Sequence, residues 1–305
     1  MSEGIAQGLY LEASAIDHSC VPNAVWSYQG KEMIIRTINN VEDFSDLRIS
    51  YLLKLYENTS RRRQKLLKEY YFLCQCSRCL DFESDQLKSS VLCSECLTGC
   101  VPIKTGICVD CNYQINDFIM EEHKILKNQI SNFVSDYEKG NVTLCLNRVY
   151  LILFSFLGSS MIENTELHLE LFQHSVKIFH PYDIDFMELT NLFCLKKLDV
   201  KDGKNLYKNI IILKQNLNIM LTNYYKHLPY YDLNIGGKEI EMANLCNILG
   251  CLDEAEDHIE KAKDILQVRL GKNHPLINKK WNKVRQEINM NRRQIKNKTR
   301  KKLSQ

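Results

Sequence analysis

Ile16-Asp17-His18-Ser19-Cys20-Val21-Pro22-Asn23 is the stretch that decides the fold, and it acts together with Cys74-Gln75-Cys76-Ser77-Arg78-Cys79 further along the chain. One cysteine from the first stretch and three from the second supply the four thiols of a tetrahedral zinc site. Such a site would pin together two segments that are far apart in the sequence. We therefore predict a zinc ion bound by Cys20, Cys74, Cys76 and Cys79.

A second group of thiols follows between residues 91 and 115. Its two C-x-x-C pairs, Cys93 with Cys96 and Cys108 with Cys111, are separated by eleven residues. Pairs at this spacing, each followed by turn-forming or strand-forming residues, are typical of a small zinc ribbon. We predict that these four thiols bind a second zinc ion. Cys100 is a spare thiol in the same segment, and we do not expect it to be a ligand.

The composition is that of a globular protein, with 305 residues of which 45% are apolar and 25% charged. The chain opens without a basic segment followed by an apolar one, and its longest apolar run, 149 to 157, is roughly half of what a bilayer crossing needs. We therefore expect a soluble protein of the cytoplasm, the nucleus or both, with no membrane contact. In such a reducing compartment the thirteen cysteines favour metal binding over disulfides. Four of them stand singly in apolar helical contexts, where we expect buried small hydrophobic residues: Cys145, Cys194, Cys246 and Cys251.

Local patterns in the first 70 residues predict short strands and then a helix. Ala24 to Tyr28 and Met33 to Ile38 are apolar runs around a turn at Gln29-Gly30-Lys31, which is typical of a β-hairpin. Leu47 to Tyr51 adds a third short strand. Asn58-Thr59-Ser60 is a helix N-cap signal, and it predicts a basic helix over residues 61 to 70.

Beyond Phe118 the apolar residues recur at helical spacing. The first such helix runs through Ile125 to Tyr137 and stops at Gly140. Further helices are expected at 142 to 157, 163 to 178, 184 to 198, 204 to 226, 237 to 249 and 252 to 270. In the last pair, small residues such as Ala243 and Ala255 stand where two antiparallel helices would approach closely, in the manner of a tetratricopeptide repeat (TPR).

The tail from Lys279 onward holds eleven lysines and arginines and one acid, Glu287. Clustered cations can bind the phosphates of nucleic acid. A solvated helix end that runs into disorder explains the same composition without any ligand, and we favour this second interpretation. We therefore expect no specific nucleic-acid partner.

The two stretches quoted first and Leu47-Arg48-Ile49-Ser50-Tyr51 between them resemble the second half of a SET methyltransferase domain with its post-SET zinc site. Specifically, they resemble the SET and MYND domain-containing (SMYD) family, closely over residues 1 to 80 and loosely over the remainder. The resemblance implies an α+β protein that combines a partial SET β-fold, cysteine-rich zinc sites and an all-α TPR-like domain. Its expected parts are a partial SET domain (1–56), a post-SET zinc segment (57–80), a zinc-ribbon-like insertion (81–118), a TPR-like helical domain (119–285) and a basic tail (286–305).

What the resemblance implies for function is S-adenosylmethionine-dependent methylation of a lysine in a histone or another protein, and hence a role in chromatin. Tyr51 would be the catalytic tyrosine, although by itself it would read as an ordinary strand residue. Asp17 and His18 would hold the cofactor, and His18 taken alone could instead be a zinc ligand. Tyr70 would line the active site and Phe72 would stack on the adenine, because aromatic faces stack well on purines. S-adenosylmethionine and zinc are the expected cofactors.

Three departures from the family pattern bear on activity. The family has asparagine where this chain has Asp17, and a carboxylate cannot donate a hydrogen bond as an amide does. Phe44 replaces a turn glycine, which excludes an easy positive φ there. The opening SET strands with their glycine-rich cofactor segment, and the MYND zinc finger, would lie before residue 1. We therefore expect this chain to represent the C-terminal two-thirds of such an enzyme and to be weakly active or inactive by itself.

A second hypothesis comes from a different functional class. The chain could be a non-catalytic, zinc-stabilised interaction module whose helical domain binds a peptide. A sequence-specific DNA-binding zinc protein is a weaker alternative, because neither thiol cluster is followed by the histidines and recognition helix of a zinc finger.

Overall fold

The protein is described by a computed structural model that covers residues 8–138, 164–195, 203–272, 274, 277 and 281–303. These residues belong to two compact units. Unit 1 combines residues 1–80 with residues 207–305, and unit 2 holds residues 81–206. The domain boundaries expected from the sequence remain predictions.

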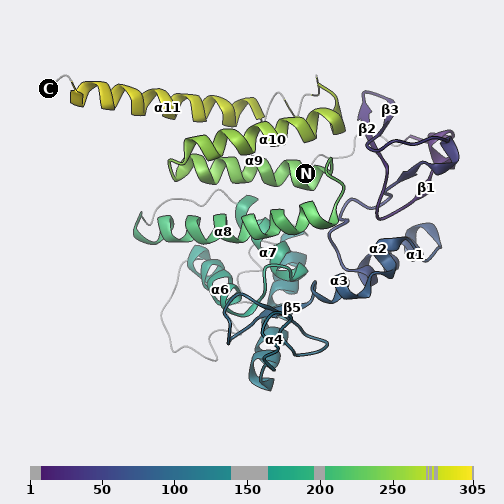
Figure 1. Ribbon diagram of the computed structural model, residues 1–305, viewed down its shortest axis with the longest axis horizontal. Helices are drawn as coiled ribbons and strands as arrows, with labels where there is room; N and C mark the ends of the chain where they lie inside the picture. Colours follow the sequence, from purple (N-terminus) through teal and green to yellow (C-terminus); the bar gives the residue numbers. More distant parts are fainter. Residues whose placement is uncertain are drawn as a thin grey trace. The chain divides into compact units, whose positions relative to one another are not determined.

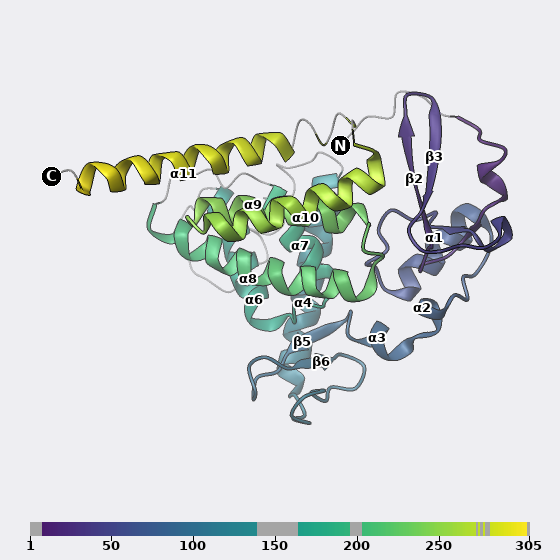
Figure 2. The same ribbon diagram turned by 45° about the horizontal axis from the view of Figure 1, so that its top comes forward.

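Unit 1 begins with short strands around a small apolar core. β2 (Ala24–Gln29) and β3 (Glu32–Thr37) form the predicted antiparallel hairpin (Figure 2). In its register Trp26 lies opposite Ile35. The two-residue turn starts at Gly30, whose φ of +61° is a backbone conformation that glycine adopts without steric cost. The hairpin expected from the sequence is confirmed.

The third predicted strand, β4 (Arg48–Ile49), pairs with β1 (Asp17–His18) and not with the hairpin. This pairing is parallel, with Asp17 opposite Arg48 and His18 opposite Ile49. Short 3-10 turns precede each strand, at Ala13–Ala15 and at Phe44–Asp46. The parallel pair therefore brings the two segments that carry His18 and Tyr51 side by side.

Two helices lead from this pair to the cysteine cluster. α1 (Thr59–Tyr70) starts where the sequence predicts it, because the Asn58 side chain accepts a hydrogen bond from the Arg61 backbone N–H at 2.9 Å. α1 ends at Tyr71, whose φ of +60° places it in the left-handed conformation. The short α2 (Ser77–Leu80) then carries the last cysteine of the C-x-C-x-x-C motif.

In the part of the second half of unit 1 that the structure describes, helices lie in a stack (Figure 1): most of α8 (Gly203–His227), α9 (Leu233–Ile248), α10 (Leu252–Leu270) and α11 (Asn282–Leu303). α9 and α10 pack closely because Ala243, Ala255 and Ala262 are fully buried at their contact. The turn between them passes through Gly250, with φ of +79°. The predicted close helix pair is confirmed, whereas its assignment to a TPR-like domain stays a prediction.

α11 contains the basic segment, where the sequence favours a helix end followed by disorder. Its described part is helical because one face packs on α10: Ile288 is fully buried, and the indole N–H of Trp281 donates to the Ile259 carbonyl at 2.7 Å. Arg285 and Arg292 pair with acids of α10, Arg285 with Glu260 at 2.8 Å. Part of the cationic tail is therefore partnered within the protein.

The strands and helices of unit 1 share a core. Tyr56 stacks on Tyr224 of α8 with ring centroids 5.5 Å apart, and the Asn234 side chain of α9 donates to the Leu53 carbonyl. The Arg269 guanidinium of α10 lies 5.8 Å from the centre of the Trp26 ring. These contacts link β2 and the segment between β4 and α1 to the ends of the helices.

Unit 2 consists of a small hairpin packed on helices. Its elements are α3 (Phe82–Gln86), β5 (Ser90–Leu92), β6 (Cys100–Pro102), α4 (Asp117–Glu138), α6 (Asn164–Ile178) and α7 (Ile184–Leu195). Val91 forms a β-bridge with Phe179, and the Asp183 carboxylate caps α7 while accepting from the Ser90 N–H. The thiol segment is thus built into the core of this unit.

The helices expected from the sequence after residue 118 are observed within a few residues of their predicted bounds, except that α4 already begins at Asp117. The predicted helix end at Gly140, the segment expected at 142–157 and Cys145 lie outside the described residues. The side chain of Cys194, which is predicted to be buried, is also outside the described part of the chain. Cys246 is buried as predicted, whereas Cys251 is exposed because it sits in the turn before α10. Within the described part of the chain, none of the helices combines the length and the apolar character that crossing a membrane demands.

Candidate functional site

Strands β1 and β4 position a histidine and a tyrosine against each other. The Tyr51 backbone N–H donates a hydrogen bond to Nδ1 of His18 at 3.0 Å, and the Tyr51 hydroxyl donates to the Ile16 carbonyl at 2.7 Å. The Trp26 indole donates to the carbonyl of Ser50 at 3.0 Å and holds the backbone just before Tyr51. The tyrosine is therefore anchored through its own backbone, its hydroxyl and its neighbour.

His18 and Tyr51 line a pocket of about 450 Å³. Its lining consists of Asp17, His18, Arg48, Tyr51, Tyr70 and Phe72. The rings of Tyr51 and Tyr70 lie 4.7 Å apart, and those of His18 and Phe72 lie 5.9 Å apart. Aromatic faces from a strand, a helix end and a loop thus converge on a small polar cavity.

Burial controls the charge of this pocket. It lowers the pKa of His18 to about 4, with nearby Cys76 raising and Arg62 lowering it, so the imidazole is neutral at pH 7. Burial, together with the charges of Asp17 and Tyr70, raises the pKa of the Tyr51 hydroxyl. Tyr51 therefore keeps its proton and can both donate and accept hydrogen bonds.

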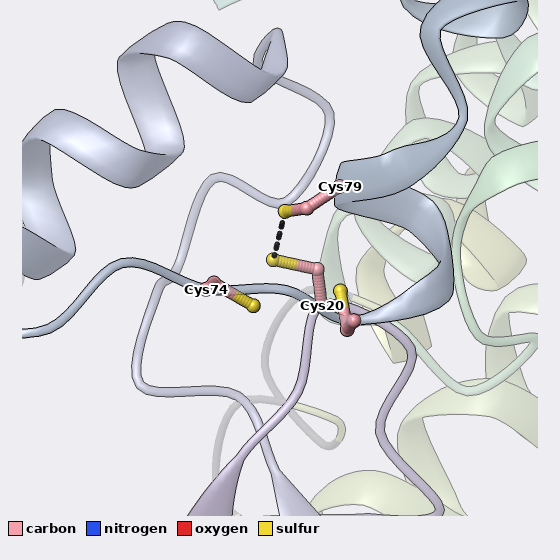
Figure 3. A group of neighbouring side chains, drawn as sticks. Cys20, Cys74 and Cys79 are labelled. Atoms are coloured by element: carbon pink, nitrogen blue, oxygen red, sulfur yellow. Dashed lines mark hydrogen bonds between the residues drawn. The ribbon is translucent and has the colours of Figure 1, made fainter.

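The four cysteines of the first cluster converge beside this pocket. Figure 3 shows the sulfur atoms of Cys20, Cys74 and Cys79 pointing toward one another. All four sulfur atoms, including that of Cys76, lie within 4.8 Å of one another, and those of Cys20 and Cys79 are 3.6 Å apart. Zn–S bonds of about 2.3 Å in a tetrahedron give sulfur separations of about 3.8 Å. The donor set therefore fits zinc, and 3.6 Å is too long for a disulfide bond.

Buried positive charge surrounds this cluster. Arg62 is fully buried in α1, and its Nη2 atom donates to the Cys79 sulfur at 3.4 Å. Burial lowers the pKa of Arg78 to about 10, an effect that Arg62 reinforces and that Cys20 opposes. A zinc ion with four thiolates would carry two net negative charges, which these two guanidinium groups would balance. No local sequence pattern predicts this role of the two arginines, because it depends on how α1 and α2 pack.

The second thiol cluster forms in unit 2. Cys93, Cys96, Cys108 and Cys111 also have their sulfur atoms within 4.8 Å of one another, with Cys93 and Cys111 3.6 Å apart. Hydrogen bonds to the backbone N–H groups of Thr98 and Gly99 lower the pKa of Cys96 to about 7, the first of them contributing most. A thiol that ionises this readily is suited to bind a cation. This donor set is also compatible with zinc.

The residue after each C-x-x-C pair of this cluster has the same backbone conformation. Leu97 and Asn112 follow the second cysteine of each pair with φ of +63° and +59°, and each backbone N–H bonds to the carbonyl of the pair's first cysteine. Gly99 lies against the sulfurs, because a Cβ atom there would come within 2.4 Å of the Cys108 sulfur. Cys100 is outside the group of four, and burial raises the pKa of its thiol to about 11.

The structure brings the five predicted pocket residues together and adds Arg48, which the sequence analysis missed. Arg48 lies opposite Asp17 in the β1–β4 pair, yet its guanidinium donates to the carbonyls of Ser45 and Leu47, both at 2.7 Å. Only knowledge of the strand pairing would have placed it at the pocket. Phe44 begins a 3-10 turn and does not have a positive φ, so its replacement of glycine causes no strain there.

No protein-family model matches the chain. Histone-lysine N-methyltransferase ASHR1 of Arabidopsis thaliana is 25% identical over 288 residues, which cover 88% of this chain and 53% of that protein. N-lysine methyltransferase SMYD2 of Mus musculus is 23% identical over 284 residues, 93% of this chain and 55% of SMYD2.

Histone-lysine N-methyltransferase SMYD3 of Mus musculus is 35% identical over a shorter match of 81 residues, 27% of this chain and 19% of that protein. The chain is similar to SMYD-type lysine methyltransferases. The SMYD resemblance inferred from the motifs is thereby confirmed. The chain spans about half the length of ASHR1 and SMYD2.

Proposed function

We propose that unit 1 carries the active-site residues of a protein-lysine N-methyltransferase that uses S-adenosylmethionine. The observation that supports this most is the pocket formed by Asp17, His18, Tyr51, Tyr70 and Phe72. It gathers an aromatic face, a hydroxyl and a carboxylate next to a four-cysteine cluster. The similarity to SMYD-type lysine methyltransferases points to the same chemistry.

S-adenosylmethionine would supply a methyl group attached to a positively charged sulfur. The half-buried Phe72 ring offers a face for the adenine, and neutral His18 borders the same space. Because His18 Nδ1 accepts from Tyr51, its position is fixed and the adenine side of the pocket is preorganised. Asp17 is exposed at the pocket and can accept hydrogen bonds from the hydroxyl or amino groups of a ligand.

Tyr51 would act on the lysine side of the reaction. Its hydroxyl donates its proton to the Ile16 carbonyl, which leaves its lone pairs free to accept a hydrogen bond from an incoming amine. Tyr51 also remains protonated because burial raises its pKa. A neutral, fixed hydroxyl can align an amine for methyl transfer, since the main requirement of this reaction is positioning.

We further propose that both cysteine clusters hold structural zinc ions. Cys20 lies just after β1, separated from it by Ser19, whereas Cys74, Cys76 and Cys79 follow α1. An ion bound by these four thiolates would lock the two sides of the pocket to each other. The cluster in unit 2 would do the same for the hairpin of β5 and β6.

The proposal is tested by calorimetric titration of S-adenosylmethionine into the purified chain, its Phe72→Ala variant and its Tyr71→Ala variant. Tyr71 is the matched control, because it is the adjacent aromatic residue and its side chain is 86% exposed. Stacking of a base on an aromatic ring is worth about 1–3 kcal/mol. We expect Phe72→Ala to weaken binding by about tenfold to a hundredfold or more, and Tyr71→Ala to leave it unchanged. Equal losses in both variants, or no binding by the unmodified chain, would contradict the proposal for this chain.

A further inference from the structure

A third group of metal-ligating side chains lies in the helical half of unit 1, away from the two cysteine clusters. Cys246 of α9 faces Glu254 and His258 of α10, and one ligand atom from each of the three lies within 4.8 Å of the others. Cys246 is fully buried and His258 nearly so, whereas Glu254 is about half exposed. The sequence predicts a buried hydrophobic thiol at Cys246, but its surroundings are polar.

His258 is held in the orientation typical of a metal ligand. Its Nδ1 atom is 2.5 Å from Oε2 of Glu239, a buried carboxylate whose other oxygen accepts from the Tyr225 hydroxyl at 2.5 Å. A carboxylate at Nδ1 holds a proton on that nitrogen, which leaves Nε2 as the nitrogen available to a metal ion. Metal-binding histidines are usually held in this way by a carboxylate on the other ring nitrogen.

The Nε2 atom of His258 faces the Glu254 carboxylate. It lies 3.9 Å from Oε1 of Glu254, close to the separation of about 3.3 Å that two ligands have on one tetrahedral zinc with bonds of about 2.0 Å. Glu254 and His258 are four residues apart on α10 and share a face of the helix. The other carboxylate oxygen of Glu254 is occupied by the ammonium of Lys214 at 2.6 Å.

The charges of this cluster balance when a divalent cation is added. With Cys246 as a thiolate, the three anions are Cys246, Glu239 and Glu254, and the only cation among the groups just described is Lys214. A divalent ion brings the sum to zero, with His258 neutral. Anions in a partly buried helix contact are costly unless they are paired in this way.

We propose that Cys246, Glu254 and His258 bind one Zn²⁺ ion through Sγ, Oε1 and Nε2. Binding displaces the thiol proton of Cys246 into solvent, and water completes the tetrahedron. The mixed sulfur, nitrogen and oxygen donor set differs from the four-thiolate clusters, so the two kinds of site are distinguishable by spectroscopy. The ion joins α9 to α10 and stabilises the helix pair.

Cobalt substitution and metal analysis of the full chain test this site. The protein is loaded with excess Co²⁺ or Zn²⁺ and desalted, and the bound metal is counted for the unmodified chain, Cys246→Ala, Glu254→Gln and Cys251→Ala. Cys251 is the matched control, because it is an exposed cysteine in the turn between the same helices and lies outside the three-residue group. We expect Cys246→Ala and Glu254→Gln to bind one metal ion fewer than the unmodified chain and Cys251→Ala to bind the same number.

The cobalt difference spectrum between the unmodified chain and Cys246→Ala should contain a thiolate-to-cobalt charge-transfer band. Should Cys246→Ala fail to fold, Glu254→Gln gives the answer, because the Glu254 side chain is 44% exposed and tolerates the change. Equal metal content in the unmodified chain and in a folded Cys246→Ala or Glu254→Gln variant would overturn the proposal. The count is a difference between variants, so it does not depend on whether the pocket binds S-adenosylmethionine.

Discussion

The Tyr51 backbone N–H donates to Nδ1 of His18 at 3.0 Å, while Nε2 of the same ring lies 3.3 Å from the Cys20 sulfur. Because Nδ1 accepts a hydrogen bond, Nε2 carries the proton and donates it to the sulfur. His18 therefore joins the proposed catalytic tyrosine to the proposed zinc ligand. In this position His18 would support the proposed metal site through Cys20.

Replacing His18 by alanine should weaken both ends of this link. The Tyr51 N–H would lose its partner, at a cost of about 1–3 kcal/mol in unfolding free energy. Loss of a group that hydrogen-bonds a metal ligand typically costs about tenfold to a hundredfold in metal affinity. Chelator competition should therefore strip one zinc faster from His18→Ala, whereas Phe44→Ala, an exposed change in the same unit, should behave like the unmodified chain. Identical release rates would argue against the link.

Cys76→Ser should remove one zinc and loosen the pocket. A structural zinc contributes directly to folding energy, so the β1–β4 pair should lose amide-exchange protection at residues 17–18 and 48–51. Cys93→Ser, in the cluster of unit 2, should also lose one zinc but leave those amides protected. Mass-spectrometric hydrogen exchange and metal analysis of both variants measure this difference. Unchanged protection in Cys76→Ser would mean that the cluster does not hold the pocket together.

Gly99→Ala should disrupt the second cluster. The added methyl group would lie 2.4 Å from the Cys108 sulfur and 2.7 Å from the Cys96 sulfur, so the metal ligands would have to move. We expect loss of one zinc and a destabilisation of about 1–3 kcal/mol, measured by metal analysis and chemical denaturation.

Gly237→Ala is the control for this change and a prediction in itself. Gly237 lies inside α9, and a Cβ atom there would meet nothing within 4 Å. Alanine should therefore stabilise the protein by about 0.5–1 kcal/mol, because glycine in a helix loses more conformational freedom on folding. A stable, fully metallated Gly99→Ala would refute the packing argument.

His180 should make the stability of unit 2 sensitive to acid. Burial lowers the pKa of His180 to about 4 from an ordinary value of 6.5, and its Nδ1 accepts from the Tyr182 N–H. Above pH 6.5 His180 is neutral in both the folded and the unfolded chain, so it does not change the free energy of unfolding. Between pH 6.5 and pH 4 only the unfolded chain takes up the proton, so the free energy of unfolding falls as the pH falls. By pH 5 the loss should be roughly 2 kcal/mol.

The measurement is urea denaturation of the unmodified chain and of His180→Asn between pH 8 and pH 5. Asparagine offers an acceptor near the position of Nδ1 and does not titrate, so the variant should lose less stability over this range. Parallel pH profiles for the two proteins would show that His180 is not the acid-sensitive group.

Much of the candidate site could be predicted because its signals are local. The sequence spacing of Cys74, Cys76 and Cys79 is typical of a metal site, and their sulfur atoms do lie close together. The Asn58 N-cap determines where α1 begins. The aromatic residues at the end of α1 and after it were predicted from the resemblance to the SMYD family. Their convergence on one pocket with Tyr51 agrees with that prediction, although their roles remain proposals.

What could not be predicted depends on contacts between distant segments. Arg48 reaches the pocket through the parallel pairing of β4 with β1, and Arg62 reaches the Cys79 sulfur through the packing of α1. From its sequence context Cys246 cannot be told from other buried helix cysteines, because His258 and Glu254 come close to it only through the packing of α10 on α9. A periodic pattern gives the buried face of a helix but not the residues it will meet.

Photo-crosslinking of tritium-labelled S-adenosylmethionine to the purified chain tests the central claim most directly, because peptide mapping shows where the cofactor sits. We predict label on the peptides that contain Tyr51 and Phe72, reduced in Phe72→Ala and retained in Tyr71→Ala. Excess unlabelled cofactor should abolish the labelling. Labelling that maps outside the pocket of Asp17, His18, Tyr51, Tyr70 and Phe72, or that unlabelled cofactor does not displace, would contradict the assignment of this pocket to S-adenosylmethionine.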